Sequence, residues 1–150
     1  MNNYFFFHTT WHVAATKTRV YEVLSNFEAY SIWWPQVRSV SAIEHGYKTV
    51  CKSWLPYELR FDTLQVQMNA DEGIIEGRLR GDLEGFARWH IRSLATGSRL
   101  DYLQEVDLMD PVLKKFLPIA RPAFRWNHFV MMRSGERGLR KYLDTNRSIS

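Results

Sequence analysis

The sequence predicts an α+β fold in which an antiparallel sheet is closed by a long C-terminal helix. Between residue 36 and about residue 108, apolar alternation is interrupted by short turns, and hairpins spaced this closely make an antiparallel meander. Residues 122–144 instead repeat apolar side chains every three or four positions, which is typical of one helix face. No repeat or linker divides the 150 residues, so we expect a single domain over 1–150 that buries roughly 70% of its unfolded surface.

The N-terminal segment is expected to form one strand and two short helices. Residues 4–13 alternate between a more apolar face, which should point inward, and a mixed face. Thr16 can cap a helix over 17–25. A second helical piece over 27–34 should end before Pro35, because the residue that precedes a proline avoids the α region.

Six more strands complete the predicted sheet. Their expected ranges are 37–44, 47–55, 57–69, 74–80, 83–94 and 98–108. Inside the third of these strands the apolar parity switches. Leu59 and Phe61 share one face, whereas Leu64 and Val66 follow the opposite register. One additional residue would produce that switch, so we predict a β-bulge near Asp62-Thr63 that curves the sheet.

The C-terminal region is predicted to be helical in two parts. Asp110-Pro111 opens a short helical turn that runs to about Leu117, where Pro118 breaks it. A long helix then starts at Pro122 and runs to about residue 144. The residues expected on its inward face are Phe124, His128, Met131, Gly135, Leu139 and Tyr142.

Two glycines lie near the end of this predicted helix. Gly135 and Gly138 each cost about 1 kcal/mol of helix propensity, so their position indicates a close approach of the helix to the sheet, or a bend. A close approach at that end would leave more space near Phe124 and His128. We therefore expect a pocket beneath the first half of the helix.

The net charge of +4 is concentrated at the C-terminus. Residues 110–150 carry nine Lys/Arg and three Asp/Glu, a local net charge of +6. A basic helix face of this kind can contact an anionic membrane surface or an acidic protein partner, or it can be a solvated outer face. No DNA- or RNA-binding motif accompanies the charge, so nucleic acid is not a predicted partner.

Missing motifs exclude several classes of protein. The chain has no G-x-S-x-G elbow, phosphate-binding glycine loop, H-E-x-x-H or dinucleotide fingerprint, so no cofactor and no metal is expected. Cys51 is the only cysteine, which excludes an intramolecular disulfide, and its strand-like context favours a buried, inert thiol. The first eight residues do not resemble a signal peptide, and no run approaches the roughly 20 apolar residues of a membrane span. A cytoplasmic location is therefore expected.

Five short segments of the sequence, taken in their order along the chain, together form a recognisable pattern. They are WHVAA at 11–15, VYEVL at 20–24, YSIWWP at 30–35, GDLEGFARW at 81–89 and TGSRL at 96–100. Together they resemble the START/Bet v 1-like (SRPBCC) superfamily, in particular its polyketide cyclase/dehydrase branch. The resemblance implies the helix-grip fold, a seven-stranded curved antiparallel sheet with two short helices and a long C-terminal helix around a cavity. It also implies a hydrophobic ligand such as a lipid, polyketide, sterol or quinone, in a superfamily that includes cyclases, aromatases and carriers.

His128 is the residue best suited to chemistry, because an inward-facing imidazole can protonate or orient a carbonyl. The alternative is a core histidine hydrogen-bonded to a strand carbonyl or carboxylate. Beside it, Asn127 can present an amide to the same space or hydrogen-bond locally. For the aromatic residues with a polar tip, pocket lining and ordinary core packing are both open. The predicted ligand-binding set is Trp33, Tyr57, Trp89, Tyr102, Phe124, Asn127, His128 and Met131.

Two further groups of residues have a predicted position in the fold. Trp33 and Trp34 end the second short helix, where the resemblance implies the cavity mouth, and one of them is expected to pack inward. Charged residues that alternate along the strands are expected on a solvated sheet face. These are Glu76, Arg78, Arg80, Arg88 and Arg92.

These observations lead to three hypotheses about function. The first is a protein that binds a hydrophobic or amphipathic small molecule between the sheet and the C-terminal helix. The second is an enzyme, a polyketide cyclase/aromatase or dehydratase in which His128 and a tyrosine act as acid and base. The third is an interaction module that docks through the basic helix face and has a filled core.

Overall fold

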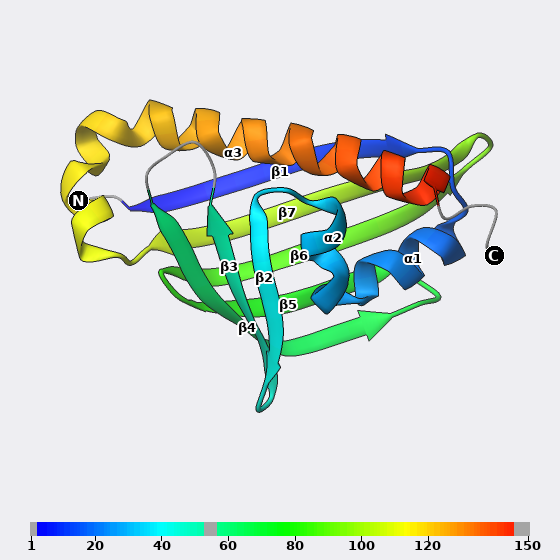
Figure 1. The fold of residues 1–150 in the computed structure, drawn as a ribbon, viewed down its shortest axis with the longest axis horizontal. Coiled ribbons are helices and arrows are strands. Elements are labelled where there is room, and N and C mark those ends of the chain that lie inside the picture. The colour runs from blue at the N-terminus through cyan, green and yellow to red at the C-terminus, as the bar shows by residue number, and fades with distance from the viewer. Residues whose placement is uncertain (1–2, 53–56, 146–150) are drawn as a thin grey trace.

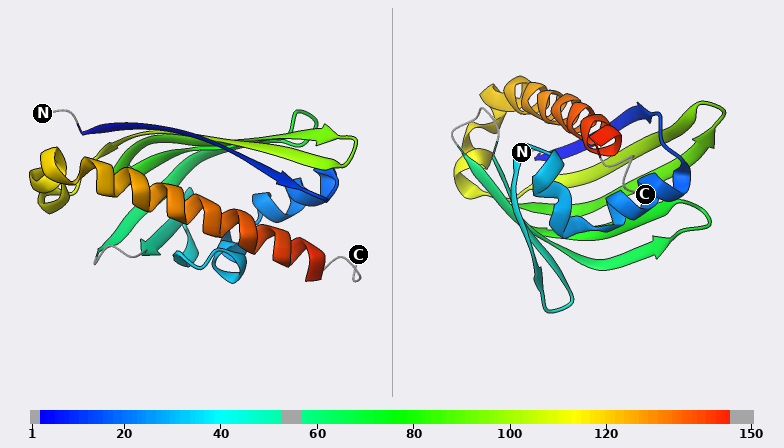
Figure 2. Two further views of the ribbon diagram at one scale, coloured as in Figure 1. Left: turned by 90° about the horizontal axis from the view of Figure 1, so that it is seen from above. Right: turned by 45° about the vertical axis from the view of Figure 1, so that its right-hand side comes forward.

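The computed structural model describes residues 3–52 and 57–145, which form one curved antiparallel sheet and a long helix that runs along its concave side (Figures 1 and 2). The strand order in the sheet is β1-β7-β6-β5-β4-β3-β2. The strands are β1 (Tyr4–Val13), β2 (Val37–Ile43), β3 (Gly46–Lys52), β4 (Glu58–Asn69), β5 (Ile74–Gly81), β6 (Leu83–Leu94) and β7 (Gly97–Leu108). The helices are α1 (Lys17–Ser25), η1 (Phe27–Ala29), α2 (Tyr30–Trp33) and α3 (Pro111–Thr145). This is the expected helix-grip architecture.

The N-terminal elements form as predicted, for the physical reasons given above. The side chain of Thr16 accepts a hydrogen bond from the backbone N–H of Arg19 at 3.2 Å and so caps α1. Val20 and Leu24 form the buried face of that helix. The second helical piece consists of η1 and α2, and it ends before Pro35.

The β-bulge in β4 lies two to three residues beyond its predicted position. Pairing between β4 and β5 shifts between Leu64 and Gln67, and Gln65 adopts a φ of 50°. The prediction near Asp62-Thr63 was wrong because Thr63 continues the inward face after Phe61 although its side chain is polar. The alternation of apolar residues therefore changes face before the β-bulge, which lies between Leu64 and Gln67.

The C-terminal helix is continuous, so the predicted break at Pro118 was wrong. Asp110 caps it as expected, since its carboxylate accepts hydrogen bonds from the N–H groups of Val112 and Leu113 at 3.0 Å each. Pro118 and Pro122 both lie inside α3. Each proline removes one backbone donor, and the helix responds by bending away from its later axis rather than by ending (Figure 1).

The two helix glycines mark a close contact, and its main partner is α2 rather than the sheet. A Cβ atom added to Gly135 would lie 2.5 Å from Cε2 of Trp34 and 2.9 Å from the ring of Trp11. A Cβ atom at Gly138 would overlap the backbone oxygen of Trp33. The C-terminal half of α3 can therefore rest on the Trp33-Trp34 backbone only while these two positions lack side chains.

The Gly138→Ala variant tests this contact. Alanine adds about 1 kcal/mol of helix propensity, but overpacking against a backbone oxygen costs about 1–3 kcal/mol. We expect a net loss of roughly 1 kcal/mol or more in the free energy of unfolding, measured by urea denaturation. Ser134→Ala, in the same helix, is the matched control and should leave stability nearly unchanged. A Gly138→Ala protein as stable as the parent would contradict the close contact.

Candidate functional site

A cavity of about 200 Å³ separates the hydrophobic core into two parts. One part gathers around Trp11, Leu24 and Leu139, where α1, α2 and the end of α3 meet the sheet. The other gathers around Phe5 and Leu113, beneath the start of α3. Residues from both parts line the cavity, which therefore lies between two packed regions and beneath the middle of α3. The structure therefore contradicts the filled core that the third hypothesis assumed.

The space exists because one row of inward positions across the sheet, here called the small-residue row, has two adjacent positions with little or no side chain, Ala87 and Gly77. The register aligns Phe7 of β1 with Gln104 of β7, Gln104 with Ala87 of β6, and Ala87 with Gly77 of β5. Gly77 stands opposite the β4 bulge, where pairing is interrupted. The sheet therefore curves at the point where its inner surface has least bulk, and this leaves room for a ligand.

The helix contributes four of the predicted residues to the lining. Phe124, Asn127, His128 and Met131 all face the cavity. The position of this part of α3 is fixed by a hydrogen bond of 2.9 Å from the indole N–H of Trp34 to the backbone oxygen of Met131.

Of the two adjacent tryptophans, Trp34 lines the cavity and Trp33 does not. Trp33 is buried behind it, stacked on the Trp34 ring at 5.4 Å between centroids and in edge contact with Trp11. The prediction that one tryptophan packs inward holds in this form, but Trp33 was placed in the ligand-binding set in error. Trp33 is the last residue of α2, whereas Trp34 is its C-cap and has an extended backbone with φ of −112° and ψ of 100°. This change of backbone conformation decides which ring meets the cavity.

The sheet contributes Trp89 and Tyr102, whereas Tyr57 lies elsewhere. Trp89 and Tyr102 sit side by side on the inner face, with ring centroids 4.6 Å apart, and both line the cavity. The hydroxyl of Tyr102 donates a hydrogen bond to Oε1 of Gln104 at 2.8 Å, and burial raises the pKa of that phenol. Tyr57 is 36% exposed, just before β4, and is not among the lining residues, so its place in the set was also wrong.

His128 lies at the cavity as a neutral imidazole. Its ring stacks on Phe7 with centroids 3.6 Å apart and an interplanar angle of 10°. Burial lowers the pKa of His128 from its ordinary 6.5 to about 4, so the ring is uncharged at neutral pH. No described residue hydrogen-bonds to it. The alternative prediction was a core histidine hydrogen-bonded to a strand carbonyl or carboxylate. No described residue of the chain provides such a partner for His128.

Asn127 has a similar unmet requirement. Its Nδ2 contacts the sulfur of Met131 at 3.9 Å, which is a weak interaction, and its Oδ1 is buried without a hydrogen-bond partner. A buried polar atom left unpaired costs about 1–3 kcal/mol. Such a cost is removed when a ligand or an ordered water supplies the missing group.

Most lining residues from the sheet were not named as site residues from the sequence, and Gln104 and Cys51 are two of them. Gln104 is buried, and its amide is the polar group of the small-residue row. The strict alternation of β7 places it on the same face as Tyr102 and Leu100, and this pattern could have identified it. Cys51 also lines the cavity, and burial raises the pKa of its thiol to about 12, so it is a protonated apolar group as expected.

The charged strand residues belong to the opposite face of the sheet. Arg88 precedes the inward-facing Trp89, and its guanidinium lies over the ring of Phe86 and 3.6 Å from the carboxylate of Glu76. Arg92 pairs at 2.8 Å with Asp101. In residues 3–52 and 57–145, no group of three or more His, Cys, Asp or Glu side chains could hold a metal ion. Arg88 and Glu76 also border the cavity, but their side chains pair with each other. The remaining polar groups of the lining are neutral: amides, phenols, an imidazole and the hydroxyls of Thr49 and Thr63.

The fold and the cavity together define a helix-grip protein with an internal cavity. The family described as "Polyketide cyclase / dehydrase and lipid transport" matches residues 6–144, and the chain belongs to this family. No curated protein matches the sequence. None of the described helices has the length and apolarity needed to cross a membrane.

Solved structures with a similar fold come from several branches of the superfamily. The Zhui aromatase/cyclase from Streptomyces sp. R1128 has a TM-score of 0.78 at 13% identity, covering 95% of each chain. A START superfamily protein from Mycobacterium smegmatis has a TM-score of 0.73 at 17% identity, covering 93% of this chain and 97% of that one. A major latex-like protein from Panax ginseng has a TM-score of 0.65 at 6% identity, covering 94% and 98%. At these identities the similarity concerns the fold. Family and fold support a ligand-binding or polyketide-cyclase role.

The low pKa of His128 predicts a specific pH dependence of stability. Because the folded-state pKa lies below the ordinary value, the unfolded chain binds this proton more readily between about pH 6.5 and pH 4. The native protein should therefore lose on the order of 3 kcal/mol of stability through this group as the pH falls across that window. We expect His128→Phe, which keeps the stack on Phe7, to lack this part of the acid destabilisation in urea unfolding at a series of pH values.

The comparison must be made against a second histidine variant, because carboxylates titrate in the same range. His12 is exposed, and His12→Phe should retain the pH dependence of the parent protein. If His128→Phe and the parent show the same pH dependence, His128 is not a buried neutral imidazole.

Proposed function

We propose that this protein binds a neutral, mainly apolar small molecule in the cavity between the sheet and α3. The observation that carries the proposal is the combination of aromatic walls with polar groups that lack partners. Asn127 has an unpaired buried oxygen, and His128 has no hydrogen-bond partner in the described chain. A ligand with an apolar body and one or two hydroxyl or carbonyl groups would meet both needs.

The size of the cavity sets the size of the ligand. An engineered cavity of about 150 Å³ accommodates benzene, and ligand pockets usually measure about 300–1,000 Å³. The 200 Å³ of this cavity therefore suits a molecule with one or two rings, or a segment of an acyl chain. A larger polyketide or lipid requires that the helix or the bulged strand move outward.

The preference for a neutral ligand follows from the polar groups at the cavity. Moving an ionised group out of water costs several kcal/mol unless an opposite charge receives it. His128 is uncharged. Arg88 borders the cavity, but its guanidinium lies over the ring of Phe86 and is already paired with the carboxylate of Glu76. Carboxylate and phosphate ligands would therefore lose hydration at this site without gaining an ion pair.

Binding of beta-naphthol tests this proposal. It is neutral, has two rings and one hydroxyl, and should bind with a measurable heat in titration calorimetry. Beta-naphthoate, which has the same rings and a negative charge, should bind about tenfold more weakly or not at all. Equal affinity for the two probes would contradict a neutral site.

A variant that fills the space provides the structural control. Ala87→Leu places a larger side chain in the small-residue row and should reduce beta-naphthol affinity by about tenfold or more. Phe86→Leu changes the neighbouring residue on the opposite face and should leave affinity unchanged. Melting temperatures of both variants show whether a loss of binding is a loss of fold.

A second candidate function is a proton transfer on an enolisable ligand, as in a polyketide cyclase/aromatase or dehydratase. The observation that favours it is the neutral imidazole of His128 with no described partner, because an unprotonated ring at a cavity can accept a proton next to a carbonyl. The buried hydroxyl of Tyr102 keeps its proton and is able to donate to the enolising oxygen, in place of its bond to Gln104. In this mechanism His128 is the base and Tyr102 the acid.

Hydrogen–deuterium exchange of beta-tetralone distinguishes the enzyme from the carrier. This neutral bicyclic ketone has exchangeable protons beside its carbonyl, and NMR follows their loss in deuterated buffer. An enzyme should accelerate exchange by about a hundredfold or more, and His128→Phe should remove the acceleration while affinity stays within a few fold. If the parent protein binds beta-tetralone without accelerating exchange, the chain acts as a binding protein for this ligand class.

A further inference from the structure

The first two thirds of α3 present a second apolar stripe, on the side that the core does not use. The buried stripe of the helix runs through Leu113, Leu117, Asn127 and Met132. The other stripe steps along the helix by three or four residues and is exposed to solvent. Its apolar members are Val112, Phe116, Ile119, Trp126 and Phe129, with exposed fractions of 48%, 53%, 87%, 58% and 52%.

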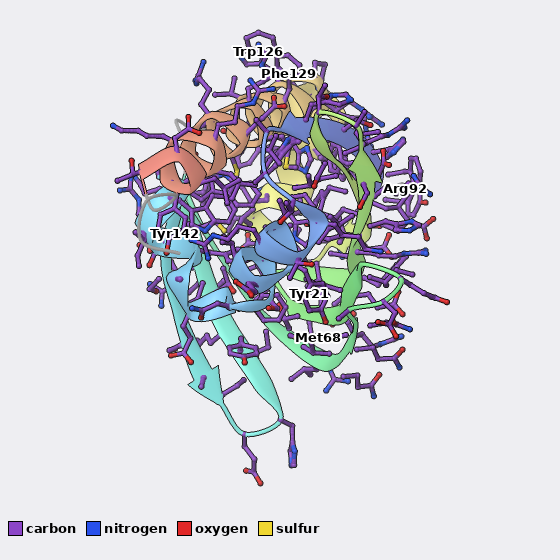
Figure 3. The ribbon with its side chains drawn as sticks, turned by 90° about the vertical axis from the view of Figure 1, so that its right-hand side faces the viewer. Tyr21, Met68, Arg92, Trp126, Phe129 and Tyr142 are labelled. Atoms are coloured by element: carbon purple, nitrogen blue, oxygen red, sulfur yellow. The ribbon has the colours of Figure 1, made fainter. Side chains whose placement is uncertain are left out.

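Trp126 and Phe129 form the most prominent part of this stripe. Their rings stack on each other at 5.4 Å between centroids, with an interplanar angle of 25°. Figure 3 shows both labelled side chains on the outer side of α3, at the edge of the molecule and away from the sheet. An isolated exposed Leu or Phe needs no explanation, but two stacked aromatic rings on a ridge of further apolar residues form a patch of the kind that marks an interaction site.

The charge of this part of the helix has one sign. Residues 111–135 contain five Lys/Arg and no Asp or Glu. Lys115 and Arg133 are exposed, and neither forms an ion pair with a described residue. Since acidic side chains are absent from this stretch, the field around the aromatic pair attracts anions.

We propose that this face of α3 docks on an anionic lipid surface, with Trp126 and Phe129 inserted at the level of the headgroups. Aromatic rings beside lysine and arginine are the composition that holds an amphipathic helix in the plane of a membrane interface. Basic residues near an anionic leaflet are attracted to it. Arg121 and Arg125 lie over the ring of Phe5, so the attraction is assigned here to the exposed Lys115 and Arg133.

The shape of the patch favours a lipid surface over a folded partner. Trp126 and Phe129 protrude from a convex helix, so a rigid protein would need a matching groove to cover them. A fluid interface needs no complementary shape. A second copy of this chain would bring like charges together, because residues 111–135 of both copies are basic.

The proposed contact also places the cavity close to the lipid. Asn127 and His128 lie between Trp126 and Phe129 in the sequence and face the cavity, while the two aromatic residues face outward. A single turn of α3 thus separates the cavity from the proposed membrane surface. This inference does not depend on the identity of the ligand or on whether the protein is an enzyme.

Vesicle co-sedimentation of the full chain tests the proposal. We expect binding to vesicles of phosphatidylcholine mixed with phosphatidylglycerol, little binding to phosphatidylcholine alone, and weaker binding at high salt. The double variant Trp126→Ser with Phe129→Ser should reduce partitioning by about tenfold or more. Leu94→Ser, which alters an exposed leucine at the end of β6, is the matched control and should bind as the parent does.

Three results would overturn the proposal. They are no binding to the anionic vesicles, binding that the double variant retains, and a dimer in analytical ultracentrifugation that the double variant converts to a monomer. The last result would assign the patch to a second copy of the chain. Because both side chains are exposed, the double variant should keep the parental melting temperature and beta-naphthol affinity, which separates this test from that of the proposed function.

Discussion

The contact between α3 and the Trp33-Trp34 segment determines where everything else in the molecule can lie. Gly135 and Gly138 let the helix rest directly on that backbone, and the indole of Trp34 donates a hydrogen bond to the carbonyl of Met131 one turn earlier. With the C-terminal end held this tightly, the helix cannot settle onto the middle of the sheet. The cavity is the consequence of one close contact at one end, with Leu113 and Leu117 packed at the other.

A cavity between two packed regions lowers the stability of the folded state. Apolar walls without contents lose dispersion contacts, and unpaired polar atoms such as Asn127 Oδ1 lose hydration. A folded domain tolerates such a cost only when the remaining core is well packed, and here the tryptophans around Trp11 provide that packing. Stability and the ligand site thus occupy separate parts of the same core.

The sequence predicted the elements well, because alternation, caps and prolines act locally. It failed where a position depends on three-dimensional context. Thr63 continues the inner face of β4 as a polar residue, which moved the expected bulge, and Pro118 bends α3 without ending it because packing on both sides outweighs one lost hydrogen bond. For the site, helix periodicity found the α3 residues. The choice between Trp33 and Trp34 depends on where α2 ends and the backbone becomes extended, which a four-residue helix is too short to reveal as a pattern.

The small residues Gly77 and Ala87 have a consequence for how the cavity can change in evolution. The volume of the site is defined by side chains that are missing at adjacent positions of two paired strands, and those strands keep their backbone hydrogen bonds whatever residue stands there. A single nucleotide change at Ala87 could enlarge that residue to valine and reshape the cavity while the tryptophan core and the glycine contact stay intact. Selection on ligand size can therefore proceed almost independently of selection on folding, which is how one scaffold can come to serve many small molecules.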